Sequence, residues 1–207
     1  MRAALDALVL QDPRLAVIEP AAGPLPWRTR PPGFPGLLQA IVAQQISNQA
    51  ASAIWRRLSV APGALDPGSL AALDDAALLA AGLSRPKVQH ARSLAAAFNS
   101  GALSGAGLAA LDDAAALAAI TAVRGLGPWT AEVYLLFAME RPDVFPAGDI
   151  AVAGAAAHLL GLAERPGPVA LRLLAEAWRP HRALAARLLW HHWRHITGRP
   201  SMDDVAL

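Results

Sequence analysis

The sequence contains no cysteine. This absence excludes disulfide bonds, zinc sites built on thiolates and iron–sulfur clusters held by cysteine. Lysine is almost as scarce. Lys87 is the single lysine, whereas the sequence contains 17 arginines. A reaction that forms a Schiff base with a protein amine therefore has only Lys87 and the N-terminus to use.

Long apolar runs are also missing, although 55% of the residues are hydrophobic. No uninterrupted run approaches the roughly 18 residues that a membrane-spanning helix needs. Asp6 interrupts what would otherwise be the apolar core of a signal peptide. We therefore expect a protein of the cytoplasm, without membrane association, and associated with the nucleoid if the source is bacterial.

The pattern of β-strands is absent as well. No segment longer than four residues shows convincing alternation of apolar and polar positions, as a half-buried strand would. Ala and Leu, which favour helices, make up most of the hydrophobic excess. The sequence therefore predicts an all-α fold of roughly ten helices. Residues 34–58 are predicted to be helical with a break near Ser47, and residues 70–80 to form one helix.

Positive charge is unevenly distributed along the chain, whose net charge is only +2. Seven arginines lie within residues 165–199, where Glu176 is the only acid, which predicts a positive surface there. Arginine suits phosphate recognition, but a GC-rich genome would also favour it over lysine.

His191 and His195 are one helical turn apart. Without an H-E-x-x-H pattern they indicate a basic helix face rather than a metal site.

The segment Arg124-Gly-Leu-Gly-Pro-Trp-Thr-Ala131 is a glycine-containing turn between two helical runs. Gly125 and Gly127 permit a close backbone approach, and Pro128 suits the first position of a helix. Free N–H groups at that helix N-terminus favour an anion such as phosphate. A plain helix–helix turn remains the alternative. A dinucleotide-binding interpretation fails, because no strand precedes the turn and no third glycine follows at the required spacing.

Asp149 follows this turn after one further helix and precedes another apolar run. An Asp at that position is most often an N-cap. An ionised carboxylate at the mouth of a cleft can also stabilise a developing cation or orient a water molecule. Asp143 is the rival acid in the same loop, and we expect it to be solvated.

Five segments of the chain carry a further signal when they are taken together. The segments are Ile41-Val-Ala-Gln-Gln-Ile-Ser47, Gly82-Leu-Ser-x-x-Lys87, Leu126-Gly-Pro-Trp-Thr-Ala131, Val144-Phe-Pro-x-x-Asp149, and Ala175-Glu-x-Trp-Arg-Pro180 leading to Leu189-Trp190. In this order, over residues 34–193, they resemble the helix-hairpin-helix (HhH-GPD) DNA glycosylases, and within them the 3-methyladenine DNA glycosylase II branch. The resemblance is to members without an extra N-terminal α/β domain, for which this chain leaves no room.

The resemblance implies one glycosylase domain over residues 1–207, built from two helical subdomains that flank a DNA-binding cleft. It places the helix-hairpin-helix at about 112–139, the catalytic loop at 143–149 and basic C-terminal helices at 168–196. Backbone N–H groups near Gly125, Gly127, Trp129 and Thr130 would bind DNA phosphate. The main-chain carbonyls of Thr121, Val123 and Leu126 would hold a structural Na⁺ or K⁺.

The resemblance also assigns the chemistry. Asp149 matches the invariable acid of the family, whereas Trp129 stands where bifunctional relatives carry a catalytic lysine. A monofunctional enzyme is therefore expected, which removes a base, cuts no strand and needs no catalytic cofactor. Trp129, Trp190 and Gln44 would line the base pocket, and Gln45 would be the wedge that fills the space left by the extruded base.

The remaining residues have less specific expectations. Trp178 and Trp193 are predicted to pack in the core, and additional phosphate contacts are expected from Arg56, Arg57, Arg85 and Lys87. The two glutamines have an alternative role as caps of backbone groups at a helix end.

The function implied is hydrolysis of the N-glycosidic bond of alkylated purines, of the 3-methyladenine and 7-methylguanine type, in base-excision repair. Base flipping would bring the base out of double-stranded DNA, and Asp149 would stabilise the oxocarbenium-like sugar. The protein is expected to be a monomer. Two alternatives stay open, namely a glycosylase for oxidised or mismatched bases and a non-catalytic helix-hairpin-helix module that binds DNA.

Overall fold

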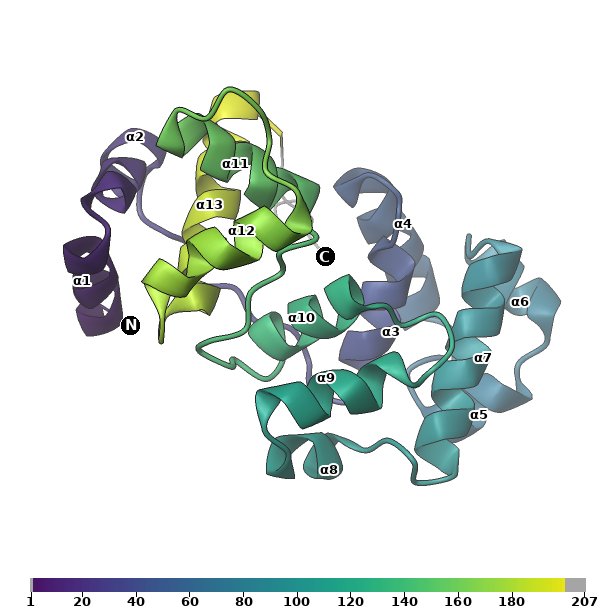
Figure 1. Ribbon diagram of the computed structural model, residues 1–207. Helices are drawn as coiled ribbons and strands as arrows, with labels where there is room; N and C mark the ends of the chain where they lie inside the picture. Colours follow the sequence, from purple (N-terminus) through teal and green to yellow (C-terminus); the bar gives the residue numbers. More distant parts are fainter. Residues whose placement is uncertain (1, 200–207) are drawn as a thin grey trace. The chain divides into compact units, whose positions relative to one another are not determined.

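The computed structural model describes residues 2–199. The regular secondary structure of this part of the chain is all helical, with thirteen α-helices and two short 3₁₀ helices, so the predicted all-α class is confirmed (Figure 1). The described residues divide into two compact helical units. The first unit comprises residues 2–28 and 140–199, and the second comprises residues 29–139. In the described chain no helix is both long enough and apolar enough to span a membrane.

The first unit joins the two ends of the described chain. The helix α13 packs against both α11 and α2, and its buried face includes Leu188 and Leu189. Trp178 is fully buried and donates its indole N–H to Asp12 at 2.9 Å. The elements of this unit are α1 (Arg2–Gln11), η1 (Pro13–Val17), α2 (Ile18–Ala22), α11 (Ile150–Leu160), α12 (Pro168–Ala175), η2 (Glu176–Trp178) and α13 (Arg182–Thr197).

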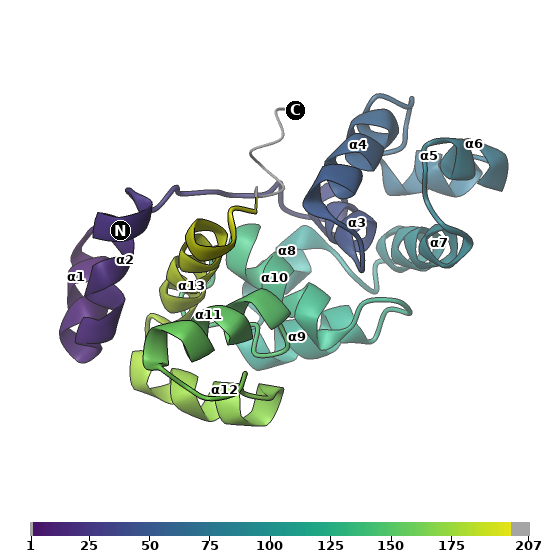
Figure 2. The same cartoon turned by 90° about the horizontal axis from the view of Figure 1, so that it is seen from above.

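The second unit is organised around α3, most of whose residues are buried. This helix contacts α4, α7 and α10, and Figure 2 shows α3 beside α4. The elements of this unit are α3 (Phe34–Ala43), α4 (Asn48–Ser59), α5 (Pro67–Ala72), α6 (Asp75–Ala80), α7 (Arg85–Asn99), α8 (Gly105–Ala110), α9 (Asp113–Thr121) and α10 (Pro128–Phe137).

Side-chain caps decide where several of these helices begin. Ser47 accepts a hydrogen bond from the N–H of Ala50, so the predicted break near Ser47 is confirmed. The prediction of one helix over residues 70–80 is wrong. Leu73 adopts an extended conformation after α5, and Asp74 then caps α6 by accepting from the N–H of Ala77.

Candidate functional site

Asp149 lies at the N-terminus of α11 and is half-buried. Its Oδ1 atom accepts hydrogen bonds from the N–H groups of Ala151 at 2.8 Å and Val152 at 2.9 Å. The indole Nε1 of Trp190, on α13, donates to the same oxygen at 3.1 Å. The N-cap role is therefore real, and the carboxylate is also oriented by a side chain 41 residues away.

Close packing of α11 on α13 sets the position of Trp190. Gly154 faces the indole ring of Trp193, and a Cβ atom at residue 154 would lie 2.5 Å from that ring. Glycine at this position therefore leaves the space in which the Trp193 ring packs against the backbone of α11. Trp193 packs against the helix that carries Asp149, in agreement with its expected structural role.

Asp143 is not the solvated acid that its loop position suggested. Its carboxylate forms ion pairs with Arg179 at 2.6 Å and Arg182 at 2.9 Å, and both arginines also bind Glu176 at 2.7 Å. The two arginines hold the pKa of the Glu176 carboxyl below its usual range, with the hydrogen bond from Arg179 as the largest cause. The group is a structural network at the start of α13.

The expected positive surface of the C-terminal helices is smaller than the arginine count implied. Arg179 and Arg182 are neutralised by the network just described. Arg187 is buried, donates to the carbonyl of Arg28 at 2.6 Å and lies 4.3 Å from the ring centre of Trp27. Three of the seven arginines are therefore committed within the first unit.

The histidines of α13 take part in packing. His158 Nδ1 and His192 Nε2 are 3.0 Å apart, and His191 Nε2 lies 2.9 Å from the carbonyl oxygen of Gly23. Burial is the largest cause that lowers the pKa of His192, followed by the charges of His158, His195 and His191. Residues 2–199 contain no cluster of three or more side chains that could hold a metal ion.

In the second unit, the turn between α9 and α10 has two glycines with different roles. Gly125 has φ of +91°, and a Cβ atom there would overlap the imidazole of His90, so the fold itself requires glycine. Gly127 has φ of −83°, and a Cβ atom would meet nothing within 4 Å. Protein packing therefore does not explain Gly127, whereas close approach of another molecule would.

The turn leaves backbone groups available. Among the described residues, the N–H groups of Gly125 and Gly127 donate no hydrogen bond, and α10 has no side-chain cap. The carbonyls of Thr121 and Leu126 likewise accept no hydrogen bond there, while that of Val123 accepts one, from Leu126 N–H at 3.1 Å. Oxygen ligands of this kind suit a hard cation. Leu126 itself is buried and anchors the turn.

The two adjacent glutamines have separate environments. Gln44 ends α3, and its Nε2 atom donates to the carbonyl of Gly125 at 2.9 Å and to the hydroxyl of Thr130 at 3.0 Å. Gln44 therefore ties the end of α3 to the turn at 122–127. Gln45 is exposed and has φ of +57°, which is uncommon for a residue with a side chain.

The cations expected to contact phosphate differ in accessibility. Lys87 is buried and donates to the carbonyl of Val42 at 2.7 Å, so it is not available to a phosphate. Arg57 donates to the carbonyl of Ala81 at 2.9 Å. Arg56 and Arg85 are exposed.

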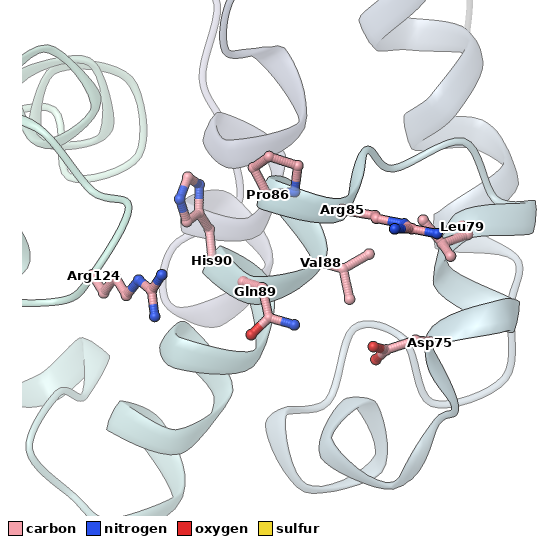
Figure 3. Close-up of a pocket in the computed structure, with 8 residues that line it drawn as sticks. All are labelled: Asp75, Leu79, Arg85, Pro86, Val88, Gln89, His90 and Arg124. Atoms are coloured by element: carbon pink, nitrogen blue, oxygen red, sulfur yellow. The ribbon is translucent and has the colours of Figure 1, made fainter.

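A cavity of about 560 Å³ lies beside the turn, within the second unit. Figure 3 shows Arg124 and His90 near one end and Arg85 near the other, with Gln89 between them. Asp75, which also lines the cavity, is paired with Arg92 at 2.8 Å. Sequence reasoning did not anticipate this cavity.

Of the predicted site residues, the structure joins Asp149 with Trp190, and Gln44 with Gly125 and Thr130. Trp129 is half-buried in the first turn of α10, in the second unit. The bond from Trp190 to Asp149 and the bond from Lys87 to Val42 were not predicted. Neither has a local sequence signal, because the partners are 41 and 45 residues apart.

Comparison with known proteins agrees with this geometry. Residues 38–180 match the family described as "HhH-GPD superfamily base excision DNA repair protein". DNA-3-methyladenine glycosylase 1 of Schizosaccharomyces pombe is 30% identical over 158 residues, which are 74% of this chain and 69% of the relative. The chain therefore belongs to the HhH-GPD superfamily of base-excision DNA repair proteins.

Two solved structures extend the similarity to almost the whole chain. A 3-methyladenine DNA glycosylase from Schizosaccharomyces pombe, in complex with abasic DNA, has a TM-score of 0.82 at 25% identity. The alignment covers 94% of this chain and 96% of the chain of that structure. A DNA-3-methyladenine glycosidase from Bacillus halodurans has a TM-score of 0.80 at 31% identity and covers 98% of this chain and 94% of its own.

Proposed function

We propose that this protein is a monofunctional DNA glycosylase that hydrolyses the N-glycosidic bond of alkylated purines, of the 3-methyladenine and 7-methylguanine type. It would act in base-excision repair on double-stranded DNA. The observation that carries the proposal is the Asp149 carboxylate, held by three N–H donors that converge on Oδ1. The names of the similar proteins support the choice of alkylated purines.

The chemistry required of the protein is modest, because a purine alkylated at N3 or N7 is already cationic and leaves readily. The transition state then develops positive charge on the sugar. A fixed carboxylate stabilises that charge without reorganising during the reaction, and it orients the attacking water. The N–H donors from α11 and Trp190 hold Asp149 ready for this role.

The turn at 122–127 would bind a DNA phosphate through the N–H groups of Gly125, Gly127, Trp129 and Thr130. Two observations support this assignment, namely the unused N–H groups of the glycines and the open space beside Gly127. The carbonyls of Thr121, Val123 and Leu126 would hold a Na⁺ or K⁺ that adds positive charge next to the phosphate. No cofactor would take part in the chemical step.

Base recognition would use aromatic rings and the glutamines. Trp129 and Trp190 offer electron-rich faces that favour cationic bases, and Gln44 would lie next to the lesion. Gln45, exposed on its strained turn, would enter the duplex as the wedge. We propose that both compact units act as one functional domain, as a monomer in the cytoplasm.

We expect no strand cleavage, because the chain lacks an amine placed to form a Schiff base with the sugar. Trp129 occupies the position of the catalytic lysine of bifunctional relatives. Of the two amines of the chain, the side chain of Lys87 is buried against a backbone carbonyl, and the N-terminus has no place in the proposed mechanism. A Schiff base with the sugar is therefore not expected, and the product would be an intact strand with an abasic site.

The decisive experiment compares wild type with Asp149→Asn on duplexes containing 3-methyladenine or 7-methylguanine. Free base is measured by chromatography, and strand breaks are measured with and without alkali. Wild type is expected to release base and to give breaks only after alkali. The Asn variant keeps the N-cap acceptor but loses the charge, and we expect a rate lower by about 10²–10³-fold.

DNA binding by both proteins, measured on an abasic duplex, is the control. If wild type releases no base from any duplex while still binding DNA, the protein is a DNA-binding module without glycosylase activity. If the Asn variant releases base at the wild-type rate, the role given to Asp149 is wrong. Release from 8-oxoguanine or mismatched duplexes, but not from alkylated ones, would favour the alternative substrate class.

A further inference from the structure

Lys87 is a buried cation that the proposed mechanism does not use. Only 9% of its surface is exposed, and its ammonium donates to the carbonyl of Val42 at 2.7 Å. Within the described chain it has no carboxylate partner. Val42 lies in the last turn of α3, where the carbonyl groups carry the negative end of the helix dipole. Lys87 therefore acts as a charged cap of α3, supplied from the first turn of α7.

The segment that follows this cap is strained. Gln44 leaves the helix with ψ of 129°, and Gln45 then adopts φ of +57°. Such a left-handed conformation is unfavourable for a residue that carries a side chain. The conformation persists only when the surroundings fix the residues on both sides.

Three interactions provide that restraint. The Gln44 side chain is bonded to Gly125 and Thr130, the Ser47 hydroxyl caps α4, and Lys87 holds the carbonyl of Val42. Together they fix the chain immediately before and after Gln45. Of the three, only the Lys87 bond has a charged donor, which comes from α7 and acts on the last turn of α3.

We propose that Lys87 is a positioning residue, whose ammonium holds the end of α3 so that the strained turn presents Gln45 to the DNA. This inference rests on the proposed function, because it gives the turn its purpose as a wedge.

The cost of this arrangement supports a functional role. Burial lowers the pKa of the Lys87 amine, which means that its charged form loses hydration at this place. A methionine would fill a similar volume without a buried charge, but it leaves the carbonyl of Val42 without this donor. Lys87→Met is therefore expected to fold with a melting temperature lower by a few degrees, while the turn loses its order.

A matched control is available on the same helix. Arg92 donates to the carbonyls of Leu70, Ala71 and Leu73 at the end of α5 and pairs with Asp75. Arg92→Met thus also removes a cation of α7 that caps another helix. That helix is remote in sequence from the Gln45 turn.

The first measurement needs no substrate. Hydrogen exchange of the free protein is followed at the amides of residues 42–44 in the last turn of α3, where the N–H of Gln44 donates to the carbonyl of Ile41 at 3.2 Å. Lys87→Met is expected to raise exchange there at least tenfold, whereas Arg92→Met leaves it unchanged and raises exchange near residues 70–75. Equal exchange at 42–44 in wild type and Lys87→Met would overturn the proposal, whatever the catalytic activity of the protein.

The second measurement is a double-mutant cycle on two signals. Base flipping is read from the fluorescence of 2-aminopurine placed next to the alkylated base, and excision is read from the single-turnover rate. Lys87→Met and Gln45→Ala are each expected to lower both signals about tenfold. In the double variant the loss should equal that of Gln45→Ala alone, since Lys87 acts through the turn. Additive losses would overturn the proposal.

Folding of the variant does not limit the test. Should Lys87→Met fail to fold, Lys87→Gln replaces it in both measurements, because glutamine keeps a donor but not the charge. Failure of the proposed function would appear as absent excision by wild type. Failure of the Lys87 proposal would appear in the exchange data, which do not depend on excision.

Discussion

The Asp149 carboxylate and the turn at 122–127 are held in place by different kinds of interaction. In the second unit, the turn is fixed by backbone conformation, by the positive φ of Gly125 and by a proline that begins α10. In the first unit, Asp149 is oriented partly by an indole from α13, which reaches it only because α11 and α13 pack closely. The backbone conformation of the turn depends on residues close in sequence, although Gln44 also bonds to it from the end of α3, whereas the bond that orients Asp149 joins residues far apart in sequence.

This difference separates two ways of losing function. Damage to the turn should weaken DNA binding, since the turn offers N–H groups to a phosphate. Damage to the contact between α11 and α13 should lower the rate of base release while DNA binding persists. The following predictions test whether the two regions fail independently.

The largest effect is expected from Gly125→Ala, compared with Gly127→Ala. Alanine at 125 must adopt φ of +91° and also overlaps His90, so we expect a loss of about 3 kcal/mol in the free energy of unfolding. Alanine at 127 meets nothing, so stability should hold while affinity for an abasic duplex falls about tenfold. Urea unfolding measures the stability of each variant, and fluorescence anisotropy measures its affinity for the abasic duplex. Equal DNA affinity of wild type and Gly127→Ala would count against phosphate binding at this turn.

An intermediate effect is expected from Gly154→Ala. The added methyl group lies 2.5 Å from the Trp193 ring, and overpacking of this kind costs about 2 kcal/mol. Displacement of α13 also lengthens the bond from Trp190 to Asp149, so the single-turnover excision rate should fall.

Trp190→Phe is the matched comparison, because it removes the donor but leaves the helix contact at Gly154 intact. We expect a rate about tenfold lower, with unchanged affinity for an abasic duplex. If Gly154→Ala lowers stability but leaves the rate of base release at the wild-type value, the positioning of Asp149 through α13 is refuted.

The smallest effect concerns pH. The pKa of His192 is lowered in the folded protein, chiefly by burial, so the unfolded chain binds the proton more tightly. Above the usual histidine pKa near 6.5, His192 therefore does not lower the free energy of unfolding. Below that pH the unfolded chain takes up the proton more readily, so the free energy of unfolding declines as the pH falls. His192→Gln should remove part of this decline, which thermal melts between pH 5 and 8 would measure as a few degrees. A decline of the same size in both proteins would exclude His192 as its source.

The same contrast explains which parts of the site could be predicted from the sequence. The positions of Gly125, Pro128 and Ser47 follow from local rules for turns and caps, and the helical class follows from composition. The division of residues 70–80 into two helices was missed, because Asp74 reads equally well as a surface residue inside one helix. Asp143 was misjudged because its partners, Arg179 and Arg182, follow it by more than 30 residues.

The sequence by itself determined the all-helical class, the turn at 122–127 and Asp149 as the acid at the start of a helix. These features depend on backbone preferences that act over a few residues. Only the tertiary structure decided that Trp190 donates to Asp149, that Gln44 is bonded to the turn and that Lys87 caps α3. The physical reason is that a buried polar group takes whichever partner the packing of distant helices brings within hydrogen-bond distance.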